Sequence, residues 1–375
     1  MHFEISYLAP IFTTIASFLF FMSVVEQYKR KHKPHQLVWA VSMFLFCITA
    51  GAEGFSLIYG SWNTYVYRTY YLFAAIQVSL MGGGLLYLFT SRNIINERNS
   101  GKASIIFGIV WVLFSALFVE RSPIFYAVLI PALIITLGGI IYQLINFVDK
   151  IRFRNAERVN ICFNCRTYQS IESTTCVNCG NAKFVTANQS SGYASFYQRL
   201  FRGHNFSHMF LGMAIYLFLL MNLYVWTLPL NTSLLKTGKE VSGTAWQPDP
   251  AKNGLADRAI IRLFSPLHTV PGAIALIGGG VYSYLSWQWS IKRTQGHFQP
   301  MTGIFNIYIA FGAWALGLGA TLSGFGLGTL YISEVISVTF MYLGFLESDH
   351  ISKDKFTKLF KFSWIWKGED KTIPS

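Results

Sequence analysis

Four of the five cysteines in this chain of 375 residues form two Cys-x-x-Cys pairs, separated by ten residues. They are Cys162, Cys165, Cys176 and Cys179. Each pair places two thiolates on one side of a tight turn, and thiolates are soft donors that bind zinc well. Two such turns complete a tetrahedral site and leave no open position on the metal. The chemistry predicted for this segment is therefore structural zinc binding, and hydrolytic zinc catalysis is not expected.

The spacing Cys-x2-Cys-x10-Cys-x2-Cys, with Gly180 after the last cysteine, closely resembles that of the zinc-ribbon family. The resemblance covers residues 162–179 and no other part of the chain. It implies three short strands pinned by a structural metal, with the four cysteines as ligands. A ribbon this small buries too little apolar surface to fold unaided, so metal binding and folding are expected to be coupled. We expect it to present a surface to a protein partner or to the chain's own cytoplasmic loops.

Other uses of the four cysteines stay open. A rubredoxin-like iron site has the same four sulfur ligands, and redox-active or metal-free thiols are a further alternative. Disulfides are disfavoured because the segment is expected in the cytoplasm, where thiols are kept reduced. Cys47 is alone in an apolar segment, and we expect it to be a small packing residue.

Two acidic residues, Glu53 and Glu334, lie within long apolar segments. An ionised side chain at the centre of a bilayer costs at least about 2.5 to 3.5 kcal/mol, so such residues mark candidate functional sites. Arg68 and His268 open two further apolar segments at the same predicted depth. Two interpretations stay open. In one, Arg68 pairs with one glutamate and only links the outer ends of the helices. In the other, the four groups form an outward-facing polar pocket for an ion, a proton or a small ligand.

Histidines suggest a different cofactor on the opposite side. His204 and His208 are four residues apart at the start of one apolar segment, and His35 and His297 lie near the ends of two others. Two histidines can ligate a haem, so a haem near the inner face is a further alternative. Histidines at helix ends are more often solvated or interfacial.

The rest of the chain is dominated by apolar segments. Its residues are 53% hydrophobic and 13% charged, which is typical of a polytopic membrane protein. A spanning helix needs about 20 apolar residues, and nine segments approach that length. They are residues 7–25, 37–58, 69–89, 103–119, 123–148, 206–228, 267–290, 303–322 and 327–346. The predicted fold class is an all-α membrane protein of about nine helices, with a small cytoplasmic zinc ribbon between the fifth and sixth.

The distribution of lysine and arginine predicts the orientation. With the amino terminus outside, 23 of the 30 basic residues fall on the cytoplasmic side, together with the ribbon and the carboxyl terminus. The net charge of +13 thus comes from clusters that flank apolar segments, and direct nucleic-acid binding is not expected. The predicted parts are helices one to five (1–149), a basic cytoplasmic segment (150–205) with the ribbon at 162–180, helices six to nine (206–350) with an outer loop at 231–265, and a basic, aromatic interfacial tail (351–375).

Three functions are compatible with these features. No phosphate-binding glycine loop, nucleophile elbow or His-Glu-x-x-His motif is present in the sequence, so an enzyme is not favoured. The first function is a membrane sensor, scaffold or complex subunit whose ribbon engages a cytoplasmic or membrane protein partner. The second is a transporter or channel in which Glu53, Arg68 and Glu334 line the path. The third is a membrane electron-transfer subunit that carries haem or rubredoxin-like iron.

Overall fold

The computed structural model consists mainly of long helices. It describes residues 5–91, 97–118, 123–152, 158–162, 168–170, 174–176, 184–188, 203–235, 245–246, 260–295, 297, 303–324 and 329–349. By length and composition, seven helices in these ranges are apolar and long enough to cross a membrane, and two further apolar helices are shorter. This set of helices is that of a multi-pass integral membrane protein, as the composition predicts.

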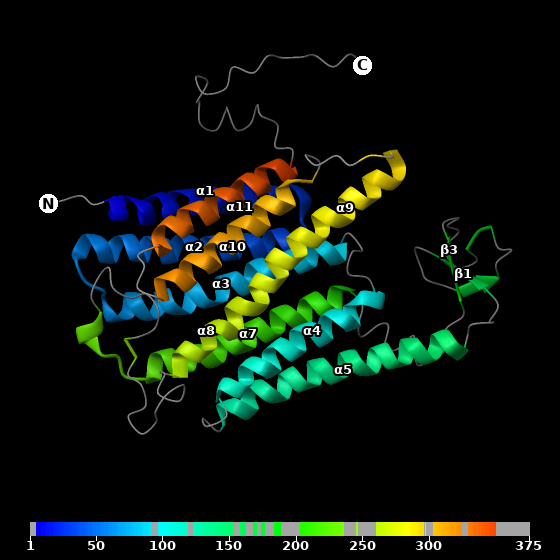
Figure 1. The fold of residues 1–375 in the computed structure, drawn as a ribbon, viewed down its shortest axis with the longest axis horizontal. Helices are drawn as coiled ribbons and strands as arrows, with labels where there is room; N and C mark the ends of the chain where they lie inside the picture. Colours follow the sequence, from blue (N-terminus) through cyan, green and yellow to red (C-terminus); the bar gives the residue numbers. More distant parts are fainter. Residues whose placement is uncertain are drawn as a thin grey trace, which may run out of the picture. The chain divides into compact units, whose positions relative to one another are not determined.

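The helices follow the predicted apolar segments. In chain order they are α1 (Ile5–Lys31), α2 (Pro34–Tyr59), α3 (Thr64–Ser91), α4 (Glu97–Ser115), α5 (Ile124–Arg152), α7 (Gly203–Thr227), α8 (Ile260–Ala273), α9 (Gly279–Gln295), α10 (Phe305–Gly324) and α11 (Leu330–Asp349) (Figure 1). Short turns of 3-10 helix follow α4 and α7, at η1 (Ala116–Phe118) and η2 (Thr232–Leu234). A π-helical turn, η4 (Ile274–Gly278), joins α8 to α9. All nine predicted segments overlap these helices, while the number that cross a membrane stays a prediction.

The seventh predicted segment begins earlier than expected. α8 starts at Ile260, within the residues assigned to the outer loop at 231–265, and it contains Pro266 and Pro271. Proline removes a backbone hydrogen bond, but neighbouring groups and local π-helical adjustments make it tolerable in membrane helices. The π-helical turn η4 begins three residues after Pro271. The helix therefore overlaps the last residues of the predicted outer loop, and the residue at which the membrane-spanning part begins stays a prediction.

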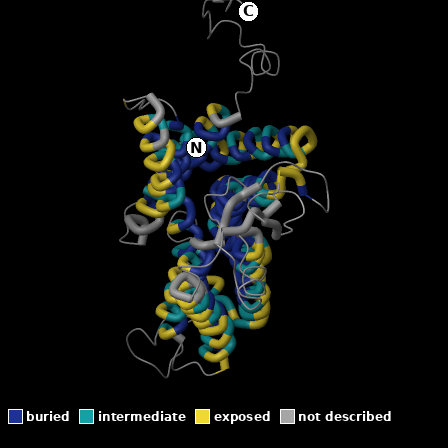
Figure 2. Tube along the Cα trace, turned by 90° about the vertical axis from the view of Figure 1, so that its right-hand side faces the viewer, coloured by how far each residue is buried: buried dark blue, intermediate teal, exposed yellow. Residues whose placement is uncertain are grey.

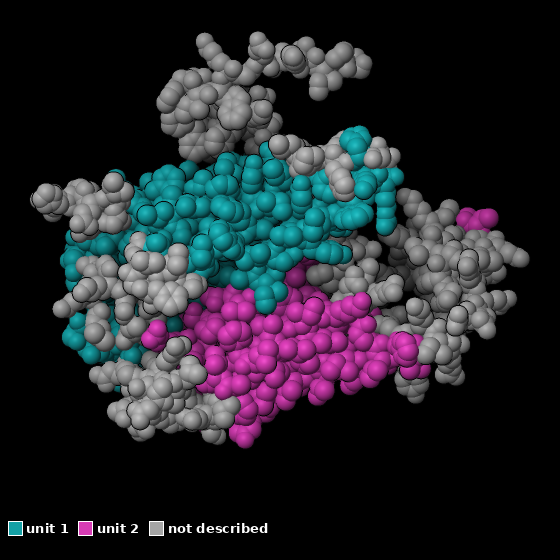
Figure 3. Space-filling model, viewed as in Figure 1, with its two compact units in different colours: residues 1–85, 225–247, 272–375 teal, residues 86–224, 248–271 magenta. Residues whose placement is uncertain are grey.

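Two compact units make up the chain (Figure 3). Unit 1 comprises residues 1–85, 225–247 and 272–375, and unit 2 comprises residues 86–224 and 248–271. The helices α3, α7 and α8 each contribute residues to both units. Along individual helices, buried residues gather on one face and exposed residues on another (Figure 2). This pattern is expected of helices that pack on one side only.

Unit 1 contains close helix contacts at glycines. A Cβ added to Gly312 of α10 would come within 2.8 Å of the Ser337 carbonyl oxygen on α11. A Cβ added to Gly82 of α3 would come equally close, 2.8 Å, to the carbonyl oxygen of Gly272 near the end of α8. Lipid tails provide no hydrophobic drive for helix association, so close backbone approach of this kind supplies the packing energy.

In the same unit, α1 packs against both α2 and α11 in a defined register. A Cβ added to Gly51 of α2 would lie 3.7 Å from the methyl group of Thr14 on α1. On α11, the Tyr342 hydroxyl hydrogen-bonds the Ser23 hydroxyl of α1 at 3.0 Å. α1 and α11 run in the same direction, and α2 runs in the opposite one (Figure 1). These contacts determine which residues of the three helices share a depth.

Unit 2 is built on the hairpin of α4 and α5. Gly108 of α4 faces Thr136 of α5, where an added Cβ would meet the backbone nitrogen at 2.9 Å. The Trp111 ring lies 5.6 Å from that of Phe210 on α7, tilted by 41°, and its indole N–H donates to the Leu267 carbonyl of α8 at 3.1 Å. The indole N–H of Trp111 therefore has a hydrogen-bond acceptor in apolar surroundings.

Between α5 and α7 in the chain, three short strands form an antiparallel sheet in the order β2-β1-β3. The strands are β1 (Arg158–Cys162), β2 (Tyr168–Ser170) and β3 (Phe184–Asn188). Val159 pairs with Ser170, and Cys162 pairs with Phe184. Three short strands are the arrangement that the zinc-ribbon resemblance implies, while the metal and its ligand set stay predictions.

Candidate functional site

Two carboxyl groups meet inside unit 1. Glu53 comes from α2 and Glu334 from α11, and their side chains interact with each other. Glu53 is 0% exposed and Glu334 is 6% exposed. The sequence singled out both residues, and the structure brings them together. We refer to them as the glutamate pair.

Two phenols face the glutamate pair. Tyr70 of α3 interacts with the Glu53 carboxyl, and Tyr331 stands one helical turn before Glu334 on the same helix. None of these contacts has the geometry of a regular hydrogen bond. As a result, both carboxyl oxygens of Glu53 and Oε2 of Glu334 are buried without a hydrogen-bond partner among the described residues.

No basic side chain of the described chain compensates the pair. The one ion pair among these residues joins Arg30 to Glu26, which are exposed on α1. Glu334 is the fifth residue of α11, near its amino-terminal end. A helix terminus carries about half an elementary charge and its effect falls off within one turn, so it does not neutralise two carboxylates. The pair therefore calls for either a shared proton or a bound cation.

Further polar groups lie at the depth of the glutamate pair or one turn from it. The register of α1 against α2 puts Thr13 within one residue of the depth of Glu53. The hydrogen bond between Ser23 of α1 and Tyr342 of α11 puts these two residues at one level. Thr13 precedes Ser23 by ten residues and Glu334 precedes Tyr342 by eight. At about 1.5 Å per residue, the depths of Thr13 and Glu334 therefore differ by about 3 Å. Thr13 is fully buried, and its hydroxyl has no hydrogen-bond partner in the described chain.

A second polar layer follows one helical turn away from the pair. It contains Ser17, Thr49, Gln77 and Ser337, which are all buried. The Thr49 hydroxyl donates to the Phe46 carbonyl at 2.9 Å and lies 3.4 Å from Oε1 of Gln77. We call these four residues the hydroxyl-amide layer. Together with the glutamate pair, it makes the interior of unit 1 polar over two helical turns.

Arg68 has a different role from the expected one. Its guanidinium donates to the carbonyls of Val225 and Leu228, the latter at 2.9 Å, and lies 5.8 Å from the ring centroid of Trp226. The last carbonyls of a helix lack intrahelical partners, and the helix dipole favours a cation there. Arg68 therefore caps the carboxyl-terminal end of α7. The interpretation in which it pairs with a glutamate is wrong.

His268 belongs to unit 2, whereas the glutamate pair belongs to unit 1. It is fully buried on α8 and faces the backbone of Leu217 on α7. Within unit 1 the structure thus joins Glu53 with Glu334 and directs Arg68 to the end of α7, while the position of His268 relative to them stays a prediction.

Aromatic rings cover the glutamate pair on the side of Tyr70. Trp62 lies 5.1 Å from the Tyr70 ring, and its backbone N–H donates to the Leu235 carbonyl at 3.2 Å. Trp246 is 1% exposed and lies 5.2 Å from the ring of Tyr67. Segments 230–235 and 245–246 therefore pack against the connection between α2 and α3.

The cysteine positions are only partly described. Cys162 ends β1, and Cys176 is buried with an exposed fraction of 3%. Cys165 and Cys179 lie outside the described residues. No group of three or more candidate metal ligands is found among the residues that the structure describes. Zinc binding accordingly stays a prediction.

The candidate haem ligands are divided between the units. His35 of α2 and His297 belong to unit 1, and the His35 ring lies 5.7 Å from that of Trp39. His204 and His208 belong to α7 in unit 2, where the exposed His208 lies 5.2 Å from the Tyr87 ring. A haem stays an untested alternative.

Several residues of the site are missing from the sequence-based set. Tyr331 is three residues from Glu334, a spacing that puts both on one helix face, and this signal was sufficient to find it. Tyr70 resembles the neighbouring aromatic residues of a membrane interface, and Thr13 is one of many hydroxyl residues in apolar segments. Neither has a distinguishing pattern in the sequence.

Comparisons of the chain with protein-family models, with curated proteins and with solved structures find no match in any of the three.

Proposed function

We propose that the protein is a proton-coupled membrane transporter and that the glutamate pair is its proton-binding site. One observation carries the proposal: two carboxyl groups are buried against each other with no basic partner in the described chain and with unsatisfied oxygens. Charged groups in membrane interiors are costly and usually mark ion or proton pathways. The outward-facing orientation of the pair, with the amino terminus outside, is part of the proposal.

A proton fits this pair better than a metal cation does. Hard cations take six to eight oxygen ligands in calcium sites, and sodium sites in transporters typically include carbonyls of unwound helices. α2 and α11 are regular helices at Glu53 and Glu334, so their carbonyls are engaged in helical hydrogen bonds. One shared proton, by contrast, supplies a donor between the carboxyls and reduces their charge from two to one.

Binding and release of this proton provide a means of coupling. When the proton leaves, two carboxylates repel each other across the contact between α2 and α11 in a medium of low dielectric constant. Protonation removes that repulsion, so the two states favour different spacings of the helices. A difference in free energy of this kind is what shifts a transporter between conformations.

The test is proton uptake by the purified protein in liposomes that contain a pH-sensitive dye. Glu53→Gln and Glu334→Gln should each abolish the uptake that follows an external acid pulse. Glu26→Gln is the matched control, since Glu26 is an exposed glutamate whose side chain is 52% accessible. Uptake that is as fast in Glu53→Gln as in Glu26→Gln would contradict the proposal. Sodium-dependent protection against thermal unfolding that disappears in Glu53→Gln would instead assign a cation to the pair.

A second function, as a sensor, scaffold or complex subunit, is supported by the three-stranded sheet around the cysteine segment. In this proposal, zinc bound by Cys162, Cys165, Cys176 and Cys179 folds a cytoplasmic docking module. Cys162→Ser should lose zinc and partner binding while the helices stay inserted. A variant that keeps both its zinc and its partners would eliminate this function. The electron-transfer alternative is decided by a visible absorption spectrum, because a zinc protein is colourless.

A further inference from the structure

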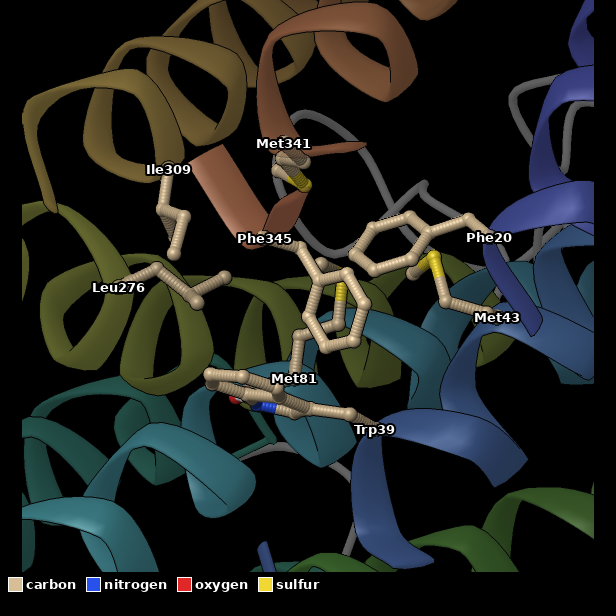
Figure 4. A pocket seen from close by; sticks show the side chains of 8 residues that line it. All are labelled: Phe20, Trp39, Met43, Met81, Leu276, Ile309, Met341 and Phe345. Carbon is tan, nitrogen blue, oxygen red and sulfur yellow. Dashed lines mark hydrogen bonds between the residues drawn. The ribbon is translucent and has the colours of Figure 1, made fainter. Parts of the chain in front are cut away.

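Beyond the hydroxyl-amide layer, the interior of unit 1 changes from polar to apolar. A small cavity lies there, and three of its lining side chains are methionines from three helices (Figure 4). The lining includes Met43 of α2, Met81 of α3, Met341 of α11, Trp39, Phe345 and Leu276. The indole N–H of Trp39 donates to the Met81 carbonyl at 3.0 Å, so it is not available to a molecule in the cavity. We call this space the methionine cavity.

The change occurs at one depth on two neighbouring helices. On α11 the buried residues at successive turns are Glu334, Ser337 and Met341, and the Ser337 hydroxyl lies 4.0 Å from the Met341 sulfur. On α1 they are Thr13, Ser17 and Phe20. Because these spacings of three and four residues keep one helix face, each helix presents two polar residues and then an apolar one to the interior.

The opposite helix shows the same order. On α2, Glu53 and Thr49 are followed toward the amino terminus by Phe46 and Met43, which are 2% and 1% exposed. The buried Ser42 beside Met43 does not line the cavity, and its hydroxyl donates to the Gln77 carbonyl at 2.7 Å. Further along α1, beyond Phe20, Ser23 makes its hydrogen bond to Tyr342, and Gln27 is again a buried polar residue. The methionine cavity is thus an apolar interval between two polar regions of one bundle.

We infer that the methionine cavity is a hydrophobic gate on the proton path that starts at the glutamate pair. This inference rests on the proposed transport function. The cavity has room for about one water molecule, and a buried water needs two to four polar partners, which this lining does not offer. The cavity therefore stays dry and interrupts the chain of hydrogen bonds that a proton follows. Apolar constrictions close membrane channels in the same way.

Two features of the cavity lining would allow the gate to open: its methionine side chains and a π-helical turn. Methionine is unbranched and has three rotatable bonds, so these side chains change rotamer more readily than branched ones would. Leu276 belongs to the π-helical turn η4, and π-helical turns are often found at functional sites. A change in this turn alters the wall of the cavity directly.

The test compares Met341→Ser with Met341→Leu in liposomes under a potassium diffusion potential, with an internal pH dye as the probe. Serine removes volume and introduces a hydroxyl, whereas leucine keeps the wall apolar. Met341→Ser should increase the proton leak at least about tenfold, which corresponds to a barrier lower by about 1.4 kcal/mol. Met341→Leu should leak as slowly as the unmodified protein. Adding Glu53→Gln to Met341→Ser should abolish the leak.

The outcomes separate the gate from the proposed function. A Met341→Ser protein that unfolds at the normal temperature and leaks no faster than Met341→Leu overturns the gate, while Glu53-dependent uptake keeps the transport function. A leak that is equally fast with and without Glu53→Gln overturns the inference, because the path then bypasses the pair. Loss of Glu53 dependence in the unmodified protein overturns the proposed function itself. If Met341→Ser does not fold, Met43→Thr against Met43→Leu gives the same comparison.

Discussion

Replacing Arg68 by alanine should destabilise the folded protein, because the Arg68 side chain hydrogen-bonds backbone carbonyls at the end of α7. Its guanidinium donates to the carbonyls of Val225 and Leu228. Hydrogen bonds from a charged donor contribute about 1.5 to 3 kcal/mol each, so the two together amount to about 3 to 6 kcal/mol. The side chain is only partly buried, and water can replace part of what is lost at a helix end. We therefore expect a loss of about 2 to 4 kcal/mol.

The assay is reversible unfolding by SDS in mixed micelles, followed by tryptophan fluorescence, since Trp226 lies 5.8 Å from the guanidinium. Arg68→Lys should lose less stability than Arg68→Ala, because the ammonium keeps the positive charge. It should still lose some stability, because lysine lacks the planar guanidinium that reaches two carbonyls. Arg262→Ala is the control, since Arg262 makes no hydrogen bond or ion pair within the described residues, and its change should stay within about 0.5 kcal/mol. An equal effect of Arg68→Ala and Arg262→Ala would refute the capping role.

Three further predictions concern packing and the cysteine segment. Gly312→Ala should cost about 1 to 3 kcal/mol of unfolding free energy, because its Cβ would meet the Ser337 carbonyl oxygen at 2.8 Å. Gly317→Ala, with nothing within 4 Å of the added Cβ, should be neutral or slightly stabilising in the same SDS titration. Trp246→Ala should cost about 3 to 5 kcal/mol, because the ring is fully buried, and an unchanged titration midpoint would contradict this. Cys176→Ser should remove zinc from the purified protein, and elemental analysis that still finds one zinc per chain would exclude Cys176 as a ligand.

The sequence was sufficient to predict the helices because membrane burial imposes a length and a polarity on each of them. Every apolar segment long enough to span a bilayer overlaps a helix. It was also sufficient to select Glu53 and Glu334, since an acidic residue in such a segment is costly and therefore uncommon. α8 begins at Ile260, seven residues before the predicted segment 267–290, because an apolar segment marks the part of a helix that can span a bilayer and not the helix's full length.

The partners of these residues were beyond the reach of the sequence. Which helices are neighbours depends on packing, including the close approach at Gly312, and an apolar helix surface carries little information about its partner. The sequence leaves Arg68 either paired with a glutamate or lining a pocket with both, but backbone carbonyls accept its hydrogen bonds, and these leave no signature in a sequence. The meeting of Glu53 with Glu334 likewise becomes visible only when α2 and α11 are placed.

The most direct test of the central claim is infrared difference spectroscopy of the carboxyl C=O stretch as the pH is raised. If the glutamate pair shares a proton, the reconstituted protein should show a buried, protonated carboxyl band that disappears on alkalinisation. The band should shift in Glu53→Gln and in Glu334→Gln, since each leaves one buried carboxyl, should be absent from the double variant, and should be unaltered in Glu26→Gln. A spectrum without such a band, or one in which Glu53→Gln leaves the band unchanged, would contradict proton binding by the pair.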